Sequence, residues 1–251
     1  MSDPLLELFP KRARSKTQMS EAHFDDYSEK YDSALADSLS ATGEDKDFFA
    51  RGRASFVAKC LQKQNAQPAS AMDYGCGIGS TTPHLLELLK VQSVIGIDVS
   101  SKCLDVAAEK FGSSQISFVP VHEFIPREEI DVVYTSGVFH HIKEEQRSSA
   151  VDLIHQALRP GGYFAFWENN PWNPGTRYVM SRCEFDEDAI TLSPPQGRKL
   201  LRSSGFEIIR TDYLFIFPRA LSWLRGIEPF VSRLPLGGQY QVLCRKPFTE
   251  S

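Results

Sequence analysis

Two adjacent histidines, His140 and His141, are the side chains of this 251-residue sequence best suited to proton transfer. An unperturbed imidazole titrates at about pH 6.5, so it can take a proton from a reacting group near neutral pH. The pair follows a largely apolar stretch, residues 130–135, with the composition of a buried strand. Ligands of open α/β sheets bind at the ends of such strands. We therefore predict that one histidine is a general base, unless the pair is structural and packs under the next helix.

A glycine-rich turn follows the strand expected over residues 71–74. Its glycines, Gly75, Gly77 and Gly79, permit positive φ and let a ligand approach bare main chain. A dinucleotide site requires G-x-G-x-x-G, but here the third glycine comes one residue early and Ser80 stands where that pattern needs glycine. The turn predicts a ligand site of another kind, or a purely structural strand-to-helix junction.

Two carboxylates end the strands on either side of this junction. Asp73 adds a carboxylate beside the free N–H groups of the turn, and Asp98 can accept two hydrogen bonds from the cis-diol of a ribose. The alternative for Asp98 is a cap on the helix that begins near Ser100. Between them, Thr82 is predicted to cap a helix whose first residue is Pro83.

The spacing D-x-G-x-G-x-G resembles the first motif of class I S-adenosylmethionine-dependent methyltransferases. The acid that ends the second strand, the segment D-V-V-Y-T-S-G-V-F-H-H-I and the sequence L-R-P-G-G before an aromatic strand resemble the same family. Together these segments cover roughly residues 70–168. The resemblance implies S-adenosylmethionine as cofactor. It also implies an α/β fold, a Rossmann-like doubly wound sheet of seven strands with an antiparallel last strand and an N-terminal helical cap.

The resemblance implies where the cofactor binds. Glu123 or the main chain would have to replace an aspartate that the family commonly places at the adenine, and residues 138–141 would face the methyl group. Arg51 and Arg53 are within reach of the cofactor carboxylate, although surface arginines are the plainer interpretation. The cofactor contacts expected are Tyr31, Asp73, Gly75, Cys76, Gly77, Gly79, Asp98, Val99, Glu123 and Ser136. No metal ligand set is predicted.

The acceptor pocket is expected after the fifth strand, where the sequence is long, polar and aromatic. The N-terminal segment F-D-D-Y-S-E-K-Y-D resembles a helix that closes over the cofactor in the same family, and it adds a tyrosine. The alternative for residues 171–175 is a structural Asn-Pro turn. The acceptor contacts predicted are Tyr27, Glu168, Asn169, Trp172, Arg177 and Tyr178.

Composition favours one soluble domain with appendages, since 41% of residues are apolar and 24% charged. We expect a tail and helical cap over residues 1–66. The methyltransferase domain follows over residues 67–251, with an acceptor loop at 169–195 and an insertion helix at 219–234. The sequence shows neither a bilayer-spanning run nor a secretory signal, which favours the cytoplasm. Five scattered cysteines predict no zinc site, and a net charge of −4 argues against nucleic acid as a partner.

The insertion carries an apolar face with arginines beside it. It fits a lid on the acceptor pocket, a homodimer contact, or a membrane-surface helix that presents a lipid-linked substrate, and ordinary core packing fits equally. For the chain as a whole, the sequence predicts methyl transfer to an oxygen of a small hydroxylated metabolite or sugar. The alternatives are N-methylation of a small amine, or a non-catalytic cofactor-binding protein that acts through a partner surface.

Overall fold

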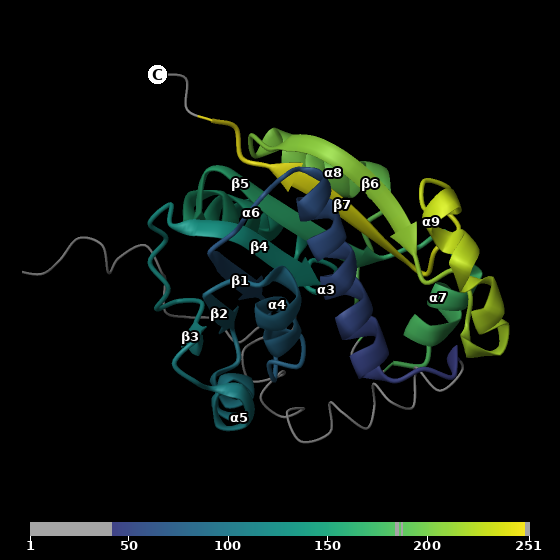
Figure 1. Ribbon diagram of the computed structural model, residues 1–251, viewed down its shortest axis with the longest axis horizontal. Helices are drawn as coiled ribbons and strands as arrows, with labels where there is room; N and C mark the ends of the chain where they lie inside the picture. Colours follow the sequence, from purple (N-terminus) through teal and green to yellow (C-terminus); the bar gives the residue numbers. More distant parts are fainter. Residues whose placement is uncertain (1–41, 184–185, 187, 249–251) are drawn as a thin grey trace, which may run out of the picture.

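The computed structural model describes residues 42–183, 186 and 188–248, and a seven-stranded sheet forms its centre (Figure 1). The strands are β1 (Ser70–Tyr74), β2 (Ser93–Asp98), β3 (Ile116–Pro120), β4 (Ile130–Ser136), β5 (Leu158–Asn169), β6 (Glu207–Leu214) and β7 (Gln239–Arg245). Their order is β3-β2-β1-β4-β5-β7-β6. The first five strands in this order, β3, β2, β1, β4 and β5, pair in parallel. Strand β7 pairs antiparallel with both β5 and β6. The predicted Rossmann-like sheet with an antiparallel last strand is confirmed.

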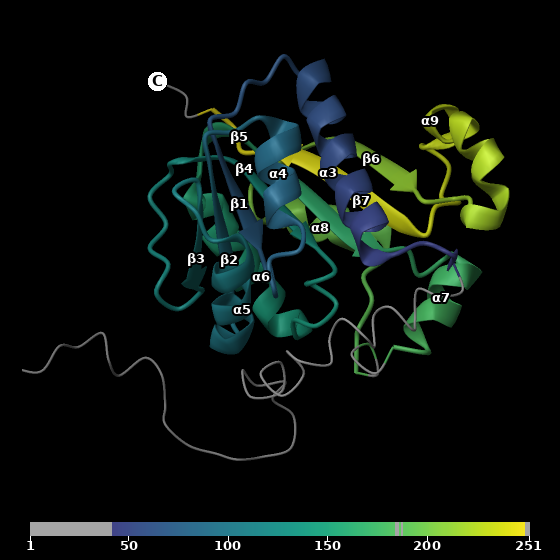
Figure 2. The same cartoon turned by 60° about the horizontal axis from the view of Figure 1, so that its bottom comes forward.

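Helices cover both faces of the sheet (Figures 1 and 2). They are α3 (Lys46–Lys63), α4 (Thr82–Leu89), α5 (Ser101–Phe111), α6 (Glu144–Ala157), α7 (Pro174–Met180), α8 (Pro194–Ser203), the 3-10 helix η4 (Arg219–Ile227) and α9 (Glu228–Val231). The buried sides of α3 and α4 share one core cluster, whereas α6 and α8 contribute to the other. None of the helices over residues 42–183 and 188–248 has the length and apolar character needed to cross a membrane.

Strand β4 shows how the sequence builds the two cores. Successive side chains of a strand point to opposite faces. Val132 and Tyr134 therefore pack in the cluster under α3, and Val133 packs in the cluster under α6. Because both faces are covered, all five interior residues of β4 are buried. This arrangement fixes the loop after β4 at the centre of the sheet's carboxyl edge.

Helix α3 packs on this sheet as a structural layer. Its N-cap Asp45 accepts a hydrogen bond from the Phe48 main-chain N–H at 2.8 Å, which satisfies an otherwise unpaired donor. Ala54 and Val57 on its inner side are fully buried in the core cluster that includes β1 and β4. The helix expected around residues 24–35 lies outside the described residues.

The connection between β6 and β7 differs from the single helix expected over residues 219–234. The structure has the 3-10 helix η4 followed by the one-turn helix α9, with non-helical backbone angles at Leu221. Pro229 stands at the start of α9, where its missing N–H is tolerated. The periodic apolar pattern was therefore insufficient to predict one continuous helix, because it is carried by two short segments.

Candidate active site

A cavity of about 680 Å³ opens at the carboxyl edge of the parallel strands. Its walls come from α3, the turn after β1, the end of β2, the loop after β4, α7 and residues 215–218. Parts of the chain that are far apart in sequence therefore meet around one space. In open α/β sheets this edge is the general position of ligand sites.

The predicted site residues divide into three groups with respect to this cavity. Those that line it are Gly75, Gly77, Asp98, Val99, Ser136, His140, His141, Asn169 and Tyr178. Those that do not line it are Asp73, Cys76, Gly79, Glu123, Glu168, Trp172 and Arg177. Tyr27 and Tyr31 lie outside the described residues.

The turn after β1 presents main chain to the cavity. Gly75 has φ +71°, and a Cβ at this position would lie 2.4 Å from Val138 Cγ2, so a side chain does not fit. Gly77 has φ +53°, and a Cβ there would meet no atom within 4 Å. Gly79 instead faces Ala107 and Phe118, so its role is packing between the turn and α5. Only the first two glycines therefore contribute to the cavity surface.

Asp98 holds this turn against β2. Its Oδ2 accepts a hydrogen bond from the Gly77 N–H at 2.8 Å, and its Oδ1 accepts one from the Ser100 N–H at 2.9 Å. Burial raises the pKa of this carboxyl, while these main-chain hydrogen bonds oppose the rise. A carboxylate has about four acceptor positions, so Asp98 retains capacity for a diol. Asp98 can therefore accept the hydrogen bond from the Ser100 N–H and still face the cavity as a possible ribose ligand.

Asp73 lies behind the turn, which corrects its expected contact with a ligand. It is 3% exposed and accepts a hydrogen bond from Thr82 Oγ1 at 2.8 Å. Burial raises its pKa to about 7, partly offset by the Thr82 hydrogen bond. Thr82 is the first residue of α4 and Thr81 is the N-cap, so the predicted capping role of Thr82 was wrong. Asp73 instead ties the strand end to the first turn of α4.

His140 is buried between two carboxylates. Its Nδ1 lies 2.6 Å from Glu168 Oε2, and its Nε2 lies 3.3 Å from Asp186 Oδ1. Burial lowers the pKa of His140, but the two carboxylates outweigh this effect and raise it to about 10. His140 therefore keeps its proton near neutral pH and is unsuited to be the general base. Glu168, expected in the acceptor wall, is 2% exposed and lies beneath His140 instead.

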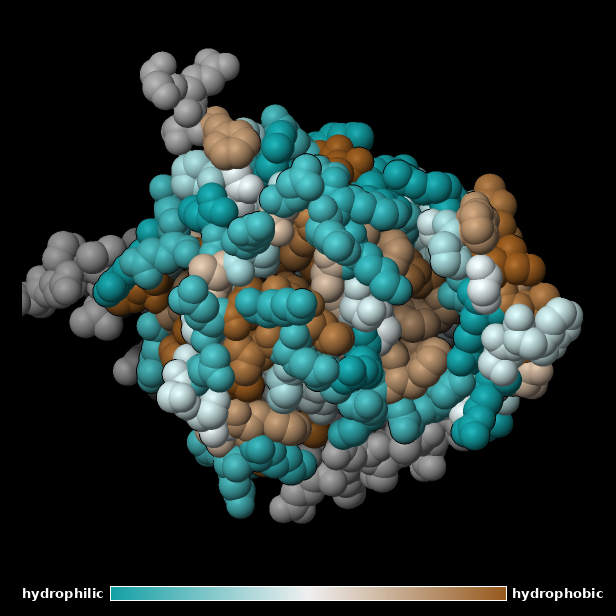
Figure 3. Space-filling model, in the orientation of Figure 1, coloured by the Kyte–Doolittle hydropathy of each residue, from teal (hydrophilic) through white to brown (hydrophobic). Residues whose placement is uncertain are grey.

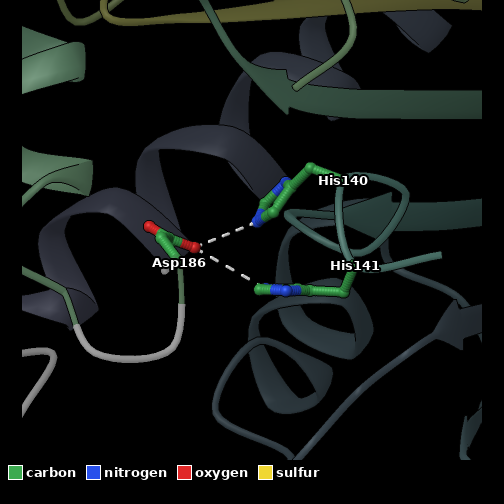
Figure 4. Close-up of side chains that lie close together, drawn as sticks. All are labelled: His140, His141 and Asp186. Carbon is green, nitrogen blue, oxygen red and sulfur yellow. Dashed lines mark ion pairs between the residues drawn. The ribbon is translucent and has the colours of Figure 1, made fainter. Parts of the chain in front are cut away.

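His141 faces the cavity beside the same aspartate (Figure 4). Its Nε2 lies 3.7 Å from Asp186 Oδ1, and its ring centroid is 4.1 Å from that of His140. Asp186 was missed as a site residue, although it lies in the acidic stretch after Cys183. Within the described residues, His140, His141 and Asp186 are also the group whose donor atoms could share a metal ion, all within 4.8 Å of one another.

Two arginines contribute to the opposite wall. Arg53 on α3 donates through Nε to the Tyr134 hydroxyl at 2.8 Å and through Nη1 to Gln239 Oε1 at 3.1 Å. Arg225 of η4 donates to Glu44 Oε1 at 2.9 Å. Arg51, one turn away from the cavity, pairs with Glu87 on the surface. Sequence reasoning treated Arg53 as a surface residue because its partners come from distant strands.

The remaining predicted contacts have other positions. Glu123 is exposed, with an oxygen 3.7 Å from His122 Nε2, and Val121 lines the cavity in its place. Trp172 is 51% exposed and outside the cavity, and its main-chain N–H donates to Asn170 Oδ1 at 3.2 Å. Asn170 is fully buried and donates to the Gly237 carbonyl at 2.8 Å. The Asn-Pro turn is thus present, and Asn173 and Gly175 from the same segment still line the cavity, so the turn and the expected acceptor wall are compatible.

Known proteins share this sequence pattern and this fold. The family of methyltransferase domains matches residues 72–164. An uncharacterized methyltransferase of Synechocystis sp. is 31% identical over 147 residues, which cover 55% of this chain and 67% of the relative. A trans-aconitate 2-methyltransferase of Rhodopseudomonas palustris is 26% identical over 188 residues, covering 67% of this chain and 73% of that protein.

Solved structures agree with the fold. The crystal structure of an S-adenosylmethionine-dependent methyltransferase from Mesorhizobium loti superposes with a TM-score of 0.55 at 19% identity, covering 74% of this chain and 96% of that one. Among four curated relatives, this chain covers from 44% to 67% of the relative's own length. The sheet order, the turn after β1 and these relatives lead to one conclusion: the chain belongs to the class I S-adenosylmethionine-dependent methyltransferases.

Proposed function

We propose that this protein transfers the methyl group of S-adenosylmethionine to an oxygen of a small hydroxylated molecule that binds beside His141 and Asp186. The observation that carries the proposal is the meeting of these two side chains in the wall of the cavity that also contains Gly77 and Asp98. A potential proton acceptor and a potential nucleoside site thus share one cavity. The small-molecule name of the trans-aconitate relative supports an acceptor of this size.

The residues present fit the family's cofactor. The bare main chain at Gly77 allows close approach, and Asp98 has acceptor capacity left for the ribose hydroxyls. Arg53, held by Tyr134 and Gln239, supplies a cation for the carboxylate of the methionine part. When bound, S-adenosylmethionine supplies a methyl group on a positively charged sulfur, which needs no further activation. The protein's task is therefore to align the acceptor and to remove its proton.

His141 removes that proton in this proposal. The acceptor oxygen gives its proton to His141 as it forms its bond to the methyl carbon, while the carbon–sulfur bond breaks. The Asp186 carboxylate then stabilises the resulting imidazolium. His140, which already holds a proton, keeps Asp186 oriented and does not exchange with the acceptor. The two adjacent histidines thus have different roles.

The test measures labelled methyl transfer to four acceptor panels, namely hydroxylated metabolites, carboxylic acids, amines and short peptides. We expect transfer to the hydroxylated panel, and we expect His141→Gln to lower turnover by about 10²- to 10⁴-fold with cofactor affinity unchanged in calorimetry. His122→Gln, an exposed histidine outside the cavity, serves as the matched control.

Several outcomes would contradict the proposal. Transfer confined to amines or peptides would replace O-methylation with N-methylation. Cofactor binding without transfer to any panel would favour a non-catalytic protein. Full turnover by His141→Gln would remove the assigned base. Turnover that a chelator abolishes and a divalent ion restores would mean that the cluster of His140, His141 and Asp186 works by holding a metal.

A further inference from the structure

Exposed apolar side chains are concentrated in the connection between β6 and β7. Of the twelve large apolar residues that are exposed in the described part of the chain, six lie within residues 221–236. Trp223 is 77% exposed and Phe230 is 87% exposed, so neither contributes much to the fold. Large apolar patches on a soluble protein generally mark a binding surface. The six are Leu221, Trp223, Ile227, Phe230, Leu234 and Leu236.

The segment before and within α7 extends this patch. Trp172 and Tyr178 are 51% and 52% exposed. Their segment is fastened to the β6–β7 connection, since Asn173 Nδ2 donates to the Leu236 carbonyl at 2.7 Å. Both elements lie at the same end of the molecule in Figures 1 and 2, and apolar residues gather over α9 in Figure 3. We call residues 221–236, Trp172 and Tyr178 together the apolar end surface.

The charge around the apolar end surface is positive. Residues 172–182 and 219–236 contain five arginines and one glutamate, whereas the whole chain carries −4. Arg225 pairs with Glu44 at 2.9 Å and Arg233 lies 3.8 Å from Asp212, so the excess positive charge comes from Arg177, Arg182 and Arg219. The single acid, Glu228, is directed inward, because its Oε1 accepts hydrogen bonds from the main-chain N–H groups of Ile216 and Phe217. Aromatic and aliphatic side chains with arginines beside them are the composition of segments that lie in an anionic bilayer interface.

The apolar end surface also continues into the active-site cavity. Tyr178 belongs to both, and Arg225 of η4 lines the cavity between Phe217 and Pro218 on one side and the exposed face of η4 on the other. None of the six apolar residues within 221–236 lines the cavity itself, so the two surfaces adjoin at Tyr178 and Arg225.

We propose that the apolar end surface binds the interface of an anionic membrane, with Trp223 and Phe230 inserted and the neighbouring arginines facing lipid headgroups. A second copy of the chain fits less well. A two-fold interface would bring the same arginine-bearing surface against itself, and like charges across an interface oppose association.

The test is sedimentation of the full-length protein with large unilamellar vesicles. We expect binding to vesicles of phosphatidylcholine and phosphatidylglycerol (3:1), weaker binding to phosphatidylcholine alone, and a blue shift of tryptophan emission on binding. The double variant Trp223→Ala/Phe230→Ala should bind at least about tenfold more weakly, because it removes the two most exposed rings. Ile125→Ala/Phe248→Ala, which removes exposed apolar groups elsewhere, should bind like the unaltered protein.

Two results would overturn the inference. One is absence of binding to the anionic vesicles, or equal binding by the Trp223→Ala/Phe230→Ala variant. The other is a dimer by light scattering that this variant converts to a monomer, which would make the surface an interface between copies. These measurements need no acceptor, so they stand or fall independently of the proposed methyl transfer.

Discussion

The turn after β1 and the wall around His141 line the same cavity, but they are held in place by different groups. The turn is fixed by main chain and short local contacts, such as the Gly75 N–H that donates to the Ile97 carbonyl at 2.8 Å. The wall is fixed by charged side chains from the loop after β4, from β5 and from the connection between α7 and α8, with His140 between Glu168 and Asp186. The first region therefore presents main chain to the cavity and relies on Asp98 and Asp73 behind it, whereas the second presents the charged side chains themselves.

Because of this difference, substitutions should change the two regions in different ways. A main-chain turn suits a cofactor whose shape is constant, since any sequence that forms the turn presents the same N–H groups. A wall of side chains from separate segments can change its chemistry one residue at a time. We therefore expect cofactor binding and acceptor choice to respond to different substitutions.

The largest effect is expected on stability, when His140 is removed from the wall. His140→Ala leaves Glu168 buried and without its charged partner, and we expect the free energy of unfolding to fall by about 3–5 kcal/mol. Urea unfolding followed by circular dichroism measures it. The paired change His140→Leu/Glu168→Leu removes both charges and should recover a substantial part of the loss. A loss below about 1 kcal/mol for His140→Ala would show that the pair is not a structural element of the wall.

A smaller effect is expected at the turn. Asp98→Ala removes the acceptor for Gly77 and for a bound diol, and we expect S-adenosylmethionine affinity to fall about 100-fold in titration calorimetry. Glu123→Ala, an exposed carboxylate outside the cavity, should leave the affinity unchanged. If Glu123→Ala weakened binding as much as Asp98→Ala, the cofactor would lie elsewhere than along the turn.

The smallest effect is expected from pH. Above pH 7 it should come mainly from His140, with a smaller contribution from Asp73, whose pKa is raised to about 7. The pKa of folded His140 is raised to about 10 from an ordinary value of 6.5, so the folded state binds the extra proton. This contribution to stability is complete below about pH 6.5 and is lost as the pH rises through about 10. We expect the unfolding free energy to fall by on the order of 1–2 kcal/mol between pH 7 and 8.5. The His140→Leu/Glu168→Leu variant should show a shallower slope, and an equal slope would assign the dependence to other groups.

The contrast between the two regions explains how far the sequence could be interpreted. The class of sheet, the turn and the place of Asp98 at the end of β2 were predictable, because each depends on a short apolar run with glycines or an acid at its end. The orientation of the Asp73 side chain was not predictable, because it is set by a hydrogen bond from Thr82 on the following helix. The protonation of His140 depends on two carboxylates from other segments, which no local pattern reveals. Sequence reasoning failed where a residue's chemistry comes from its neighbours in space.

The position of β7 has a consequence for the order in which the molecule can be assembled during synthesis. In the described sheet, β6 is an edge strand whose neighbour is β7, which is made later and enters between β5 and β6. β7 also carries Tyr240, whose hydroxyl donates to the Leu192 carbonyl, and Gln239, which holds Arg53. A growing chain can thus complete the nucleoside side of the cavity while β6 still lacks a partner. The side of the cavity that contains Arg53 takes shape last, when residues 239–245 emerge from the ribosome.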